Sequence, residues 1–331
     1  MAINEVFLGH SLFTELTLQN VLDRYGSYQS PNPHPAPRDA IDQFIYAIQD
    51  MRIANVWIQL FSRPHSDSPD DLGECDPGSQ TRATLIQRLG ENNINWVGWG
   101  YCAGKYWQKS LTLLQRLHND LNMSAFIIDA EPGNAIYANP QDPKHPLPDL
   151  WADADFDTFT SKVMLEFGND NVALTTWGVL QTQDDPGHGV PLVALMQKAA
   201  PRVAAFIPQA YWQSYPGPLQ WNSCGLSKTD FPPDDPVSFV RLVIKAWSKL
   251  GFTTPLIIAG QAYWSSDEGT PPKATMNDKV HAFTTNFADW PQILGFSWYN
   301  AGAKNTSAEG SMSKDMISTI MAAKLGPYKQ A

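Results

Sequence analysis

Short apolar runs of strand length alternate with segments of helical periodicity along the whole chain, and this alternation is the feature that most limits the fold. Helical segments are recognised by apolar residues three and four apart, as at Ile41, Phe44, Ile45 and Ile48. The strand-like runs lie at 5–9, 54–61, 95–102, 125–131, 172–179, 203–212, 255–264 and 293–299. Eight strand-and-helix units predict a (β/α)8 TIM barrel with long βα loops, built by residues 1–331 as a single domain.

The segments between these runs agree with that architecture. Asp39 precedes the first helical pattern and is expected to cap it, and the Pro-rich stretch 31–37 is expected to form a surface loop. Further helices are expected near 81–92, 106–122, 156–167, 191–200, 275–287 and 314–324, and one more where Phe239, Leu242, Val243 and Ala246 stand at helical spacing. An open doubly wound sheet would usually carry a Gly-rich phosphate turn after its first strand, and the sequence has none.

The charge of the chain narrows the choice of partners. Charged residues make up 17% of the 331 residues and the formal net charge is -10, which argues against nucleic acid or an anionic membrane as a partner. The seven His residues show no metal-ligand spacing, so no metal or other cofactor is expected. Twelve Trp and eleven Tyr residues supply many flat rings of the kind that also bind sugars.

Three Cys residues, Cys75, Cys102 and Cys224, cannot all pair with one another, so a disulfide framework is not expected. The first residues lack the basic start, the apolar stretch and the cleavage site of a signal peptide. No apolar run approaches the ~20 residues of a membrane helix. We expect a soluble monomer whose compartment stays open, either the cytoplasm or the exterior by a non-classical export route.

Two carboxylates follow the apolar run that begins at Ala125. Asp129 and Glu131 are two residues apart, so on a strand they share one face with α-carbons roughly 6.8 Å apart. Like charges this close raise the pKa of one of the two groups, as acid–base catalysis requires. The structural alternative is a pair of strand-end carboxylates that cap the next helix or meet a lysine.

Aromatic and amide side chains follow the other predicted strands, whose carboxyl ends carry the active site in a TIM barrel. Rings of this kind stack on sugar C–H faces, and amides and phenols bind hydroxyl groups. The candidate binding residues are Trp99, Tyr101, Trp177, Gln209, Tyr211, Trp212, Gln261, Tyr263, Trp264, Trp298 and Asn300. About half of the rings are expected to pack in the core instead. His10, placed at the end of the first predicted strand, could either assist or serve a structural role.

A carboxylate pair among rings suits the cleavage of glycosidic bonds, in which Glu131 would protonate the leaving oxygen. A direct retaining mechanism needs carboxyl groups on opposite sides of the bond, which two residues of one strand supply poorly. The nucleophile could therefore be an N-acetyl group of the substrate itself, held by Asp129 and by the hydroxyl of Tyr211.

Asp129-Ala130-Glu131, Gln209-Ala210-Tyr211 and Trp298 together resemble the active-site set of family 18 glycoside hydrolases, the chitinase and lysozyme group. The resemblance implies a polysaccharide or oligosaccharide substrate with N-acetylated hexosamine, as in peptidoglycan or chitin. It implies Glu131 as the acid, Asp129 and Tyr211 as holders of the acetamido group with Gln209 as a further ligand, and Trp298 as the floor of the sugar site.

The chain departs from that family at two positions, because Ile127 and Ser124 stand where the longer signature has Asp. The Asp-x-Glu pattern is also similar to family 25 lysozymes, the second choice, although the strand-one Asp of those enzymes has no counterpart near His10. Glu131-Pro132 resembles the strand-four motif of the cellulase-like clan, but Gln261 stands where its second Glu is expected. The alternative to a hydrolase is a catalytically silent carbohydrate-binding barrel, lectin-like or inhibitory.

Overall fold

The computed structural model describes residues 3–14, 18–62, 68, 70–102, 104–131, 151–180, 192–211, 235–261, 273–286, 293–300 and 314–323. Eight parallel strands in it pair in chain order and close into a barrel, with β8 beside β1. The strands are β1 (Gly9–Thr14), β2 (Asn55–Phe61), β3 (Asn95–Tyr101), β4 (Phe126–Asp129), β5 (Val172–Trp177), β6 (Ala205–Ala210), β7 (Leu256–Gln261) and β8 (Ile293–Asn300). The (β/α)8 barrel predicted from the sequence is confirmed.

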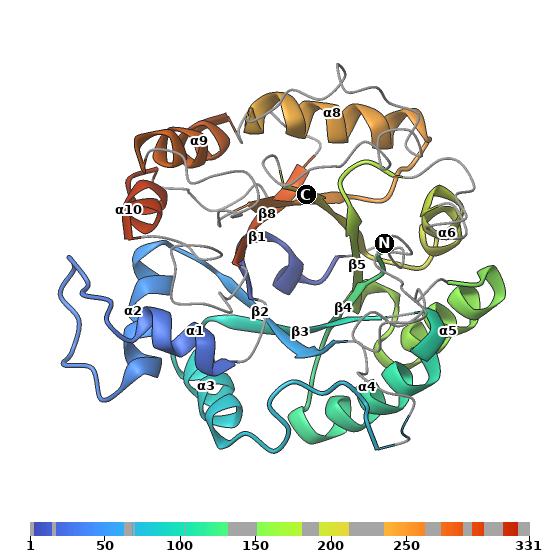
Figure 1. Ribbon diagram of the computed structural model, residues 1–331, viewed down its shortest axis with the longest axis horizontal. Helices are drawn as coiled ribbons and strands as arrows, with labels where there is room; N and C mark the ends of the chain where they lie inside the picture. Colours follow the sequence, from blue (N-terminus) through green and yellow to red (C-terminus); the bar gives the residue numbers. More distant parts are fainter. Residues whose placement is uncertain are drawn as a thin grey trace, which may run out of the picture.

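Helices surround the strands in Figure 1, which looks into the ring. They are α1 (Leu18–Tyr25), α2 (Ala40–Asp50), α3 (Gln80–Glu91), α4 (Trp107–Leu121), α5 (Asp153–Phe167), α6 (Leu192–Ala199), α8 (Pro236–Lys249), α9 (Lys273–Asn286) and α10 (Lys314–Ala322). Most match the predicted segments within a few residues. None of the described helices is long and apolar enough to span a membrane.

The first strand was predicted at 5–9, and this prediction is wrong. Glu5–Phe7 forms a 3-10 turn (η1) instead, because the side chain of Asn4 accepts a hydrogen bond from the backbone N–H of Val6 and caps the turn. The strand begins at Gly9, whose φ of +90° is a backbone conformation that suits glycine. Helix α1 was not predicted either; Asp76, far along the chain, accepts a hydrogen bond from its first N–H at 2.6 Å.

The core has two parts, separated by the wall of the barrel. Successive strand residues point to opposite faces, so alternate residues such as Phe13, Trp99 and Ile127 form the inner cluster. The remaining strand residues, such as Ile128, pack against the helices in a larger outer cluster. Membership of one cluster or the other therefore tells which way a strand side chain points.

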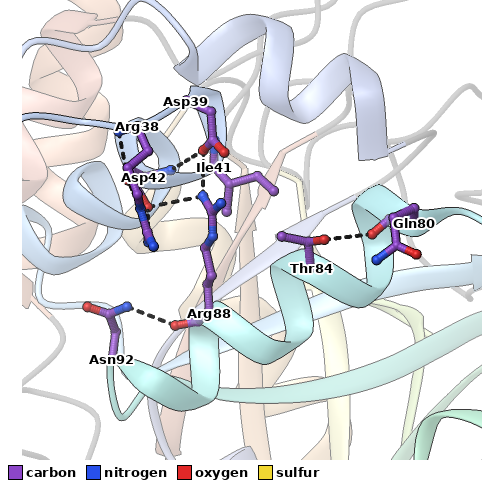
Figure 2. Close-up of polar contacts among 8 residues, drawn as sticks. All are labelled: Arg38, Asp39, Ile41, Asp42, Gln80, Thr84, Arg88 and Asn92. Atoms are coloured by element: carbon purple, nitrogen blue, oxygen red, sulfur yellow. Dashed lines mark hydrogen bonds and ion pairs between the residues drawn. The ribbon is translucent and has the colours of Figure 1, made fainter.

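An ion-pair network fastens α2 to α3 on the outside of the barrel (Figure 2). Arg88 of α3 contacts Asp39, the N-cap of α2, at 2.5 Å and Asp42 at 3.1 Å. Arg38 forms two further hydrogen bonds of 2.8 Å with Asp42, which lower the pKa of that carboxyl to about 2. The predicted capping role of Asp39 is confirmed, since its carboxylate also accepts from the N–H groups of Ile41 and Asp42.

The Pro-rich stretch is an exposed loop, as predicted, and the segment before it is held by one buried carboxylate. Asp50, at the end of α2, accepts hydrogen bonds from four side chains of residues 28–34: Tyr28 at 2.8 Å, Ser30 at 2.5 Å, Asn32 at 2.7 Å and His34 at 3.0 Å. Burial alone would raise the pKa of Asp50, but these hydrogen bonds outweigh burial and lower it.

Candidate active site

Asp129 and Glu131 share the inward face of β4 and its extension. Ile127 belongs to the inner cluster and Ala130 to the outer one, so alternation turns Asp129 and Glu131 toward the barrel axis. The backbone is held on both sides: the N–H of Cys102 donates to Asp129 O at 2.8 Å, and that of Ala130 donates to Thr175 O at 3.0 Å. Asp129 is only 6% exposed, whereas Glu131 is half-buried.

The strand registers show which side chains lie level with Asp129. In a barrel of eight strands with a shear of eight, residues at the same height along the barrel axis are not the register partners themselves. On each successive strand, the residue at that height lies about one position beyond the register partner, and we call the path through these residues a level line. Such a line starts at Gln59 and passes through Gly100, Asp129, Thr176, Gln209, Gly260, Tyr299 and Thr14 before it returns to Gln59. Alternate members point inward, so Gln59, Asp129, Gln209 and Tyr299 form one layer, named here the Asp129 layer.

The layers around it follow from the same registers. The layer beneath contains Phe13, Trp99, Thr175 and Ala259 and is largely apolar. The level above contains Tyr101, Trp177 and Gln261, and Glu131 and Tyr211 follow two residues beyond Asp129 and Gln209. Polar groups thus collect at the carboxyl end of a barrel whose lower interior is packed with rings and aliphatic side chains.

Two tyrosines stack across this end of the barrel. The ring of Tyr211, directly after β6, lies 4.9 Å from that of Tyr299 on β8, with an angle of 24° between their planes. Phe13 supports Tyr299 edge-on from β1 at 5.3 Å. Tyr299 is the inward ring of β8, and it was not among the residues to which the sequence assigned a binding role.

Trp298 lies on the other side of the barrel wall. It is 0% exposed, belongs to the outer cluster and packs on Phe283 of α9 at 5.0 Å. Its indole N–H donates to Nε2 of His10 at 2.7 Å. This placement differs from the expected floor of a sugar site, because the odd-numbered residues of β8 face the interior and Trp298 is even-numbered.

His10 is the second residue of β1 and therefore lies near the amino end of the barrel, not at the strand end where it was expected. Its Nε2 accepts a hydrogen bond from the Trp298 indole, and the backbone of Met51 and Arg52 lies beside the ring. Desolvation lowers the pKa of His10 from 6.5 to about 3, an effect that this backbone partly offsets. Of the two roles that the sequence left open for His10, the buried position and the hydrogen bond to Trp298 fit the structural one.

Two other predicted tryptophans are buried as well. Trp99 is 2% exposed, and its indole N–H donates to the backbone oxygen of Thr14 at 2.8 Å. Its ring packs edge-on against Phe13 at 4.6 Å, one layer beneath Asp129. Trp177 is 6% exposed; it lies one level above Asp129 and also contacts residues of the outer cluster. Trp99 thus supports the site from the layer beneath, and Trp177 borders it at the level above.

The remaining predicted residues divide into two groups. Gln209 and Gln261 are inward and buried, at 6% and 1% exposure, and Tyr101 is half-buried. Trp212, Tyr263, Trp264 and the side chain of Asn300 lie outside the described residues. Sequence reasoning missed Gln59, although its alternation with Trp57 in the second apolar run would have placed it on the same face.

Cys102, directly after β3, is a buried thiol close to Asp129. Burial raises the pKa of the Cys102 thiol well above its usual value, and the nearby Asp129 carboxylate raises it further. The thiol donates to the backbone oxygen of Gly100 at 3.2 Å. Among the described residues, no group of three or more His, Cys, Asp or Glu side chains is arranged to hold a metal ion.

The fold of this chain is similar to that of several proteins of known structure, three of which are glycoside hydrolases by their descriptions. The catalytic domain of a hyperthermophilic chitinase from Pyrococcus furiosus superposes with a TM-score of 0.55 at 10% identity, over 99% of this chain and 98% of that one. A fungal endo-beta-N-acetylglucosaminidase of glycosyl hydrolase family 18 gives 0.52 at 11% identity, over 96% and 97%. A family 5 xyloglucanase from Paenibacillus pabuli gives 0.54 at 11%, over 96% and 99%.

These similar structures include members of family 18, the group that the β4 motif resembles, and also a member of another glycoside hydrolase family. At such identities the likeness shows the shared fold alone. No family model matches the sequence, and no curated protein sequence matches it.

Proposed function

We propose that this protein is a glycoside hydrolase that cleaves polysaccharides containing N-acetylated hexosamine, of the peptidoglycan or chitin type. The observation that carries the proposal is the vertical order of two inward carboxylates on one strand, with Asp129 buried and Glu131 half-buried above it. Gln209 of β6 lies level with Asp129, and Tyr211, directly after β6, lies two residues beyond Gln209 as Glu131 lies two residues beyond Asp129. The fold shared with chitinases and endo-beta-N-acetylglucosaminidases supports the same substrate class.

The proposed reaction begins with proton transfer from Glu131 to the leaving glycosidic oxygen. The carbonyl oxygen of the substrate's own acetamido group attacks the sugar carbon as the bond to the leaving group breaks. Asp129 accepts a hydrogen bond from the N–H of the acetamido group, and the hydroxyl of Tyr211 donates a hydrogen bond to the carbonyl oxygen of the same group. Water then opens the cyclic intermediate with Glu131 as the base, so the configuration at the sugar carbon is retained. No bound cofactor enters these steps.

A catalytically silent carbohydrate-binding barrel is the second candidate, and Ile127 favours it. In the family 18 signature this position holds an Asp that partners the next Asp along the strand. Here Ile127 is 0% exposed and packs in the inner cluster below Asp129. A binding protein would need the polar groups at the carboxyl end of the barrel but not the proton transfer by Glu131.

Glu131→Gln separates the two candidates. Release of reducing ends from chitin oligomers and from peptidoglycan is measured together with binding of the same oligomers by calorimetry. A hydrolase loses at least about a hundredfold in turnover, typical of a removed general acid, while it keeps its affinity. The matched control is Glu5→Gln, an exposed carboxylate in η1 at the other end of the barrel, which leaves turnover unchanged. Equal binding by wild type and Glu131→Gln without turnover by either supports the silent barrel.

A further inference from the structure

Tyr299 is the inward ring of β8 at the level of Asp129, and neither the sequence motif nor the resemblance gives it a role. Its ring is stacked on that of Tyr211, with 4.9 Å between the ring centroids and 24° between the planes. Both rings pack against the inner cluster of the barrel. The stack therefore joins the last strand of the barrel to the residue that serves as a hydrogen-bond donor in the proposed reaction.

The backbone of Tyr211 lies just beyond the sheet, so its side chain depends on packing for its direction. β6 ends at Ala210, and the pair of Ala210 with Gly260 is the last one between β6 and β7. A tyrosine ring turns about two side-chain bonds, and the position of its hydroxyl therefore depends on what packs against the ring. Offset stacking at such a distance is a favourable arrangement of two aromatic rings. The Tyr299 ring thus restricts the directions in which the Tyr211 hydroxyl can point.

Tyr299 is itself held by a column of rings in the barrel interior. Phe13 of β1 contacts it edge-on, with centroids 5.3 Å apart and planes at 75°. Phe13 in turn makes edge-on contacts with Trp57 at 5.6 Å and with Trp99 at 4.6 Å. Both indole N–H groups donate hydrogen bonds to backbone oxygens, at 3.2 Å and 2.8 Å, and the three supporting rings are almost fully buried. Because a packed interior leaves such rings little room to move, Tyr299 rests on a rigid base.

The same contacts argue against Tyr299 as a platform for a sugar ring. A sugar stacks on the open face of an aromatic ring, and Tyr211 covers one face of Tyr299. Phe13 occupies a further side of the ring. The position of Tyr299 therefore favours an effect on substrate through Tyr211 over a direct contact with it.

We propose that Tyr299 is a positioning residue that acts through Tyr211. Its ring transmits the rigidity of the aromatic column to the Tyr211 ring and thereby fixes the hydroxyl that donates to the acetamido carbonyl oxygen. The consequence for catalysis rests on the proposed hydrolase function. The ring contact does not, and it is measurable in the free protein.

The first measurement is NMR of the full chain labelled with carbon-13 in its tyrosine rings. The Tyr211 signals are assigned by their loss in Tyr211→Phe. A ring stacked on Tyr211 shifts its ring protons upfield, so Tyr299→Leu is expected to move these signals downfield, whereas Tyr299→Phe keeps the ring and leaves them close to their wild-type positions. Unchanged Tyr211 signals in Tyr299→Leu overturn the proposal.

The second measurement is turnover of chitin oligomers. Tyr299→Leu is expected to lower kcat by about tenfold, as a weakened and misplaced hydrogen bond does, and to change KM little. Tyr299→Phe restores most of the lost kcat, because the ring acts and not its hydroxyl; equal losses in Tyr299→Phe and Tyr299→Leu overturn the proposal. The matched control is Tyr46→Leu, which removes one ring of a stacked pair with His34 on α2 and leaves kcat unchanged. Tyr299→Met, whose flexible side chain adapts to the gap, is the second variant should Tyr299→Leu fail to fold.

A double-mutant cycle shows whether Tyr299 acts through Tyr211. Tyr211→Phe removes the hydroxyl and keeps the stacked ring. In that background Tyr299→Leu is expected to cost little further kcat, since the hydroxyl that it would displace is already absent. Losses that multiply in the double variant show that the two residues act independently and overturn the proposal.

Failure of this inference and failure of the proposed function give different results. A wild type that releases no reducing ends refutes the hydrolase, and the same cycle is then measured on the Kd for chitin oligomers by calorimetry. Coupling between Tyr299 and Tyr211 in that Kd supports the positioning role, and independent effects overturn it. A hydrolase in which the two residues act independently keeps the function and refutes the positioning role.

Discussion

The buried His10 predicts a specific acid weakness of the fold. Its pKa is lowered from 6.5 to about 3 by burial, so the folded protein holds the imidazole neutral where the unfolded chain protonates it. Between these two values the unfolded state binds more protons than the native state. The contribution is therefore fully present above pH 6.5 and is lost progressively as the pH falls toward about 3.

The size of the effect follows from the shift. The unfolded imidazole is half protonated at pH 6.5, and below that pH the loss approaches about 1.4 kcal/mol for each pH unit, so a fall from pH 6.5 to about pH 4.5 removes about 2 kcal/mol through His10. Urea unfolding followed by tryptophan fluorescence at a series of pH values measures this. In His10→Gln the amide does not titrate, and its oxygen still accepts from the Trp298 indole. We expect this variant to lose about 2 kcal/mol less than wild type over the same interval.

The comparison removes the contributions of other acids, because Asp39, Asp42 and Asp50 titrate equally in both proteins. His281→Gln, an exposed histidine on α9, is the control and follows the wild-type curve. Parallel stability curves for wild type and His10→Gln between pH 6.5 and about 4.5 would refute the reasoning, since they would mean that the buried ring is already charged or that the unfolded state does not take up the proton.

Three further predictions test other parts of the structure. Trp298→Phe leaves the Nε2 acceptor of His10 without its donor and is expected to lower the free energy of unfolding by about 2 to 4 kcal/mol in urea titrations, while KM for the oligosaccharide stays within about twofold; a large rise in KM with unchanged stability would contradict the outward placement. Arg88→Met breaks both contacts to the start of α2 and is expected to reduce stability by about 1 to 2 kcal/mol, less at high salt, because Arg38 still pairs with Asp42; a salt-independent loss would show that packing of the side chain matters instead. Asp50→Ala removes the acceptor shared by four donors and is expected to raise hydrogen exchange and protease cleavage in residues 28–34 ahead of global unfolding, with a loss of about 3 kcal/mol; unchanged protection there would mean that the segment is held by other contacts.

The sequence predicted helices and strands well where the apolar periodicity is strong. It failed where a single local side-chain interaction determines the conformation of the backbone. Eight apolar runs were enough for the barrel, because parallel strands buried on both faces read as continuous apolar stretches. The run at 5–9 looked the same, yet the cap by Asn4 makes it a turn and moves β1 to Gly9–Thr14. A single side-chain hydrogen bond of this kind leaves no periodic signal.

The sequence predicted which strands carry the residues of the candidate site, but not whether each side chain points into the barrel or outward to the helices. Asp129 and Glu131 share one face, as their spacing required, whereas on β8 it is Tyr299 and not Trp298 that points inward, because the facing of a strand residue depends on the register. Gln59 was overlooked for a related reason: its position level with Asp129 follows from the stagger between strands, which is a property of the closed barrel. Trp212, Tyr263 and Trp264 fall outside the described residues, and their predicted roles stay predictions.

The hydrogen bond between Trp298 and His10 joins the last strand of the barrel to the first. During synthesis, β1 leaves the ribosome long before residues 293–300. Until β8 has been made, one edge of β1 and one edge of β7 have no strand to pair with. A nascent chain that stalls before Ile293 therefore presents two unpaired strand edges to its neighbours, and a truncation that removes β8 should yield aggregates rather than a smaller folded protein.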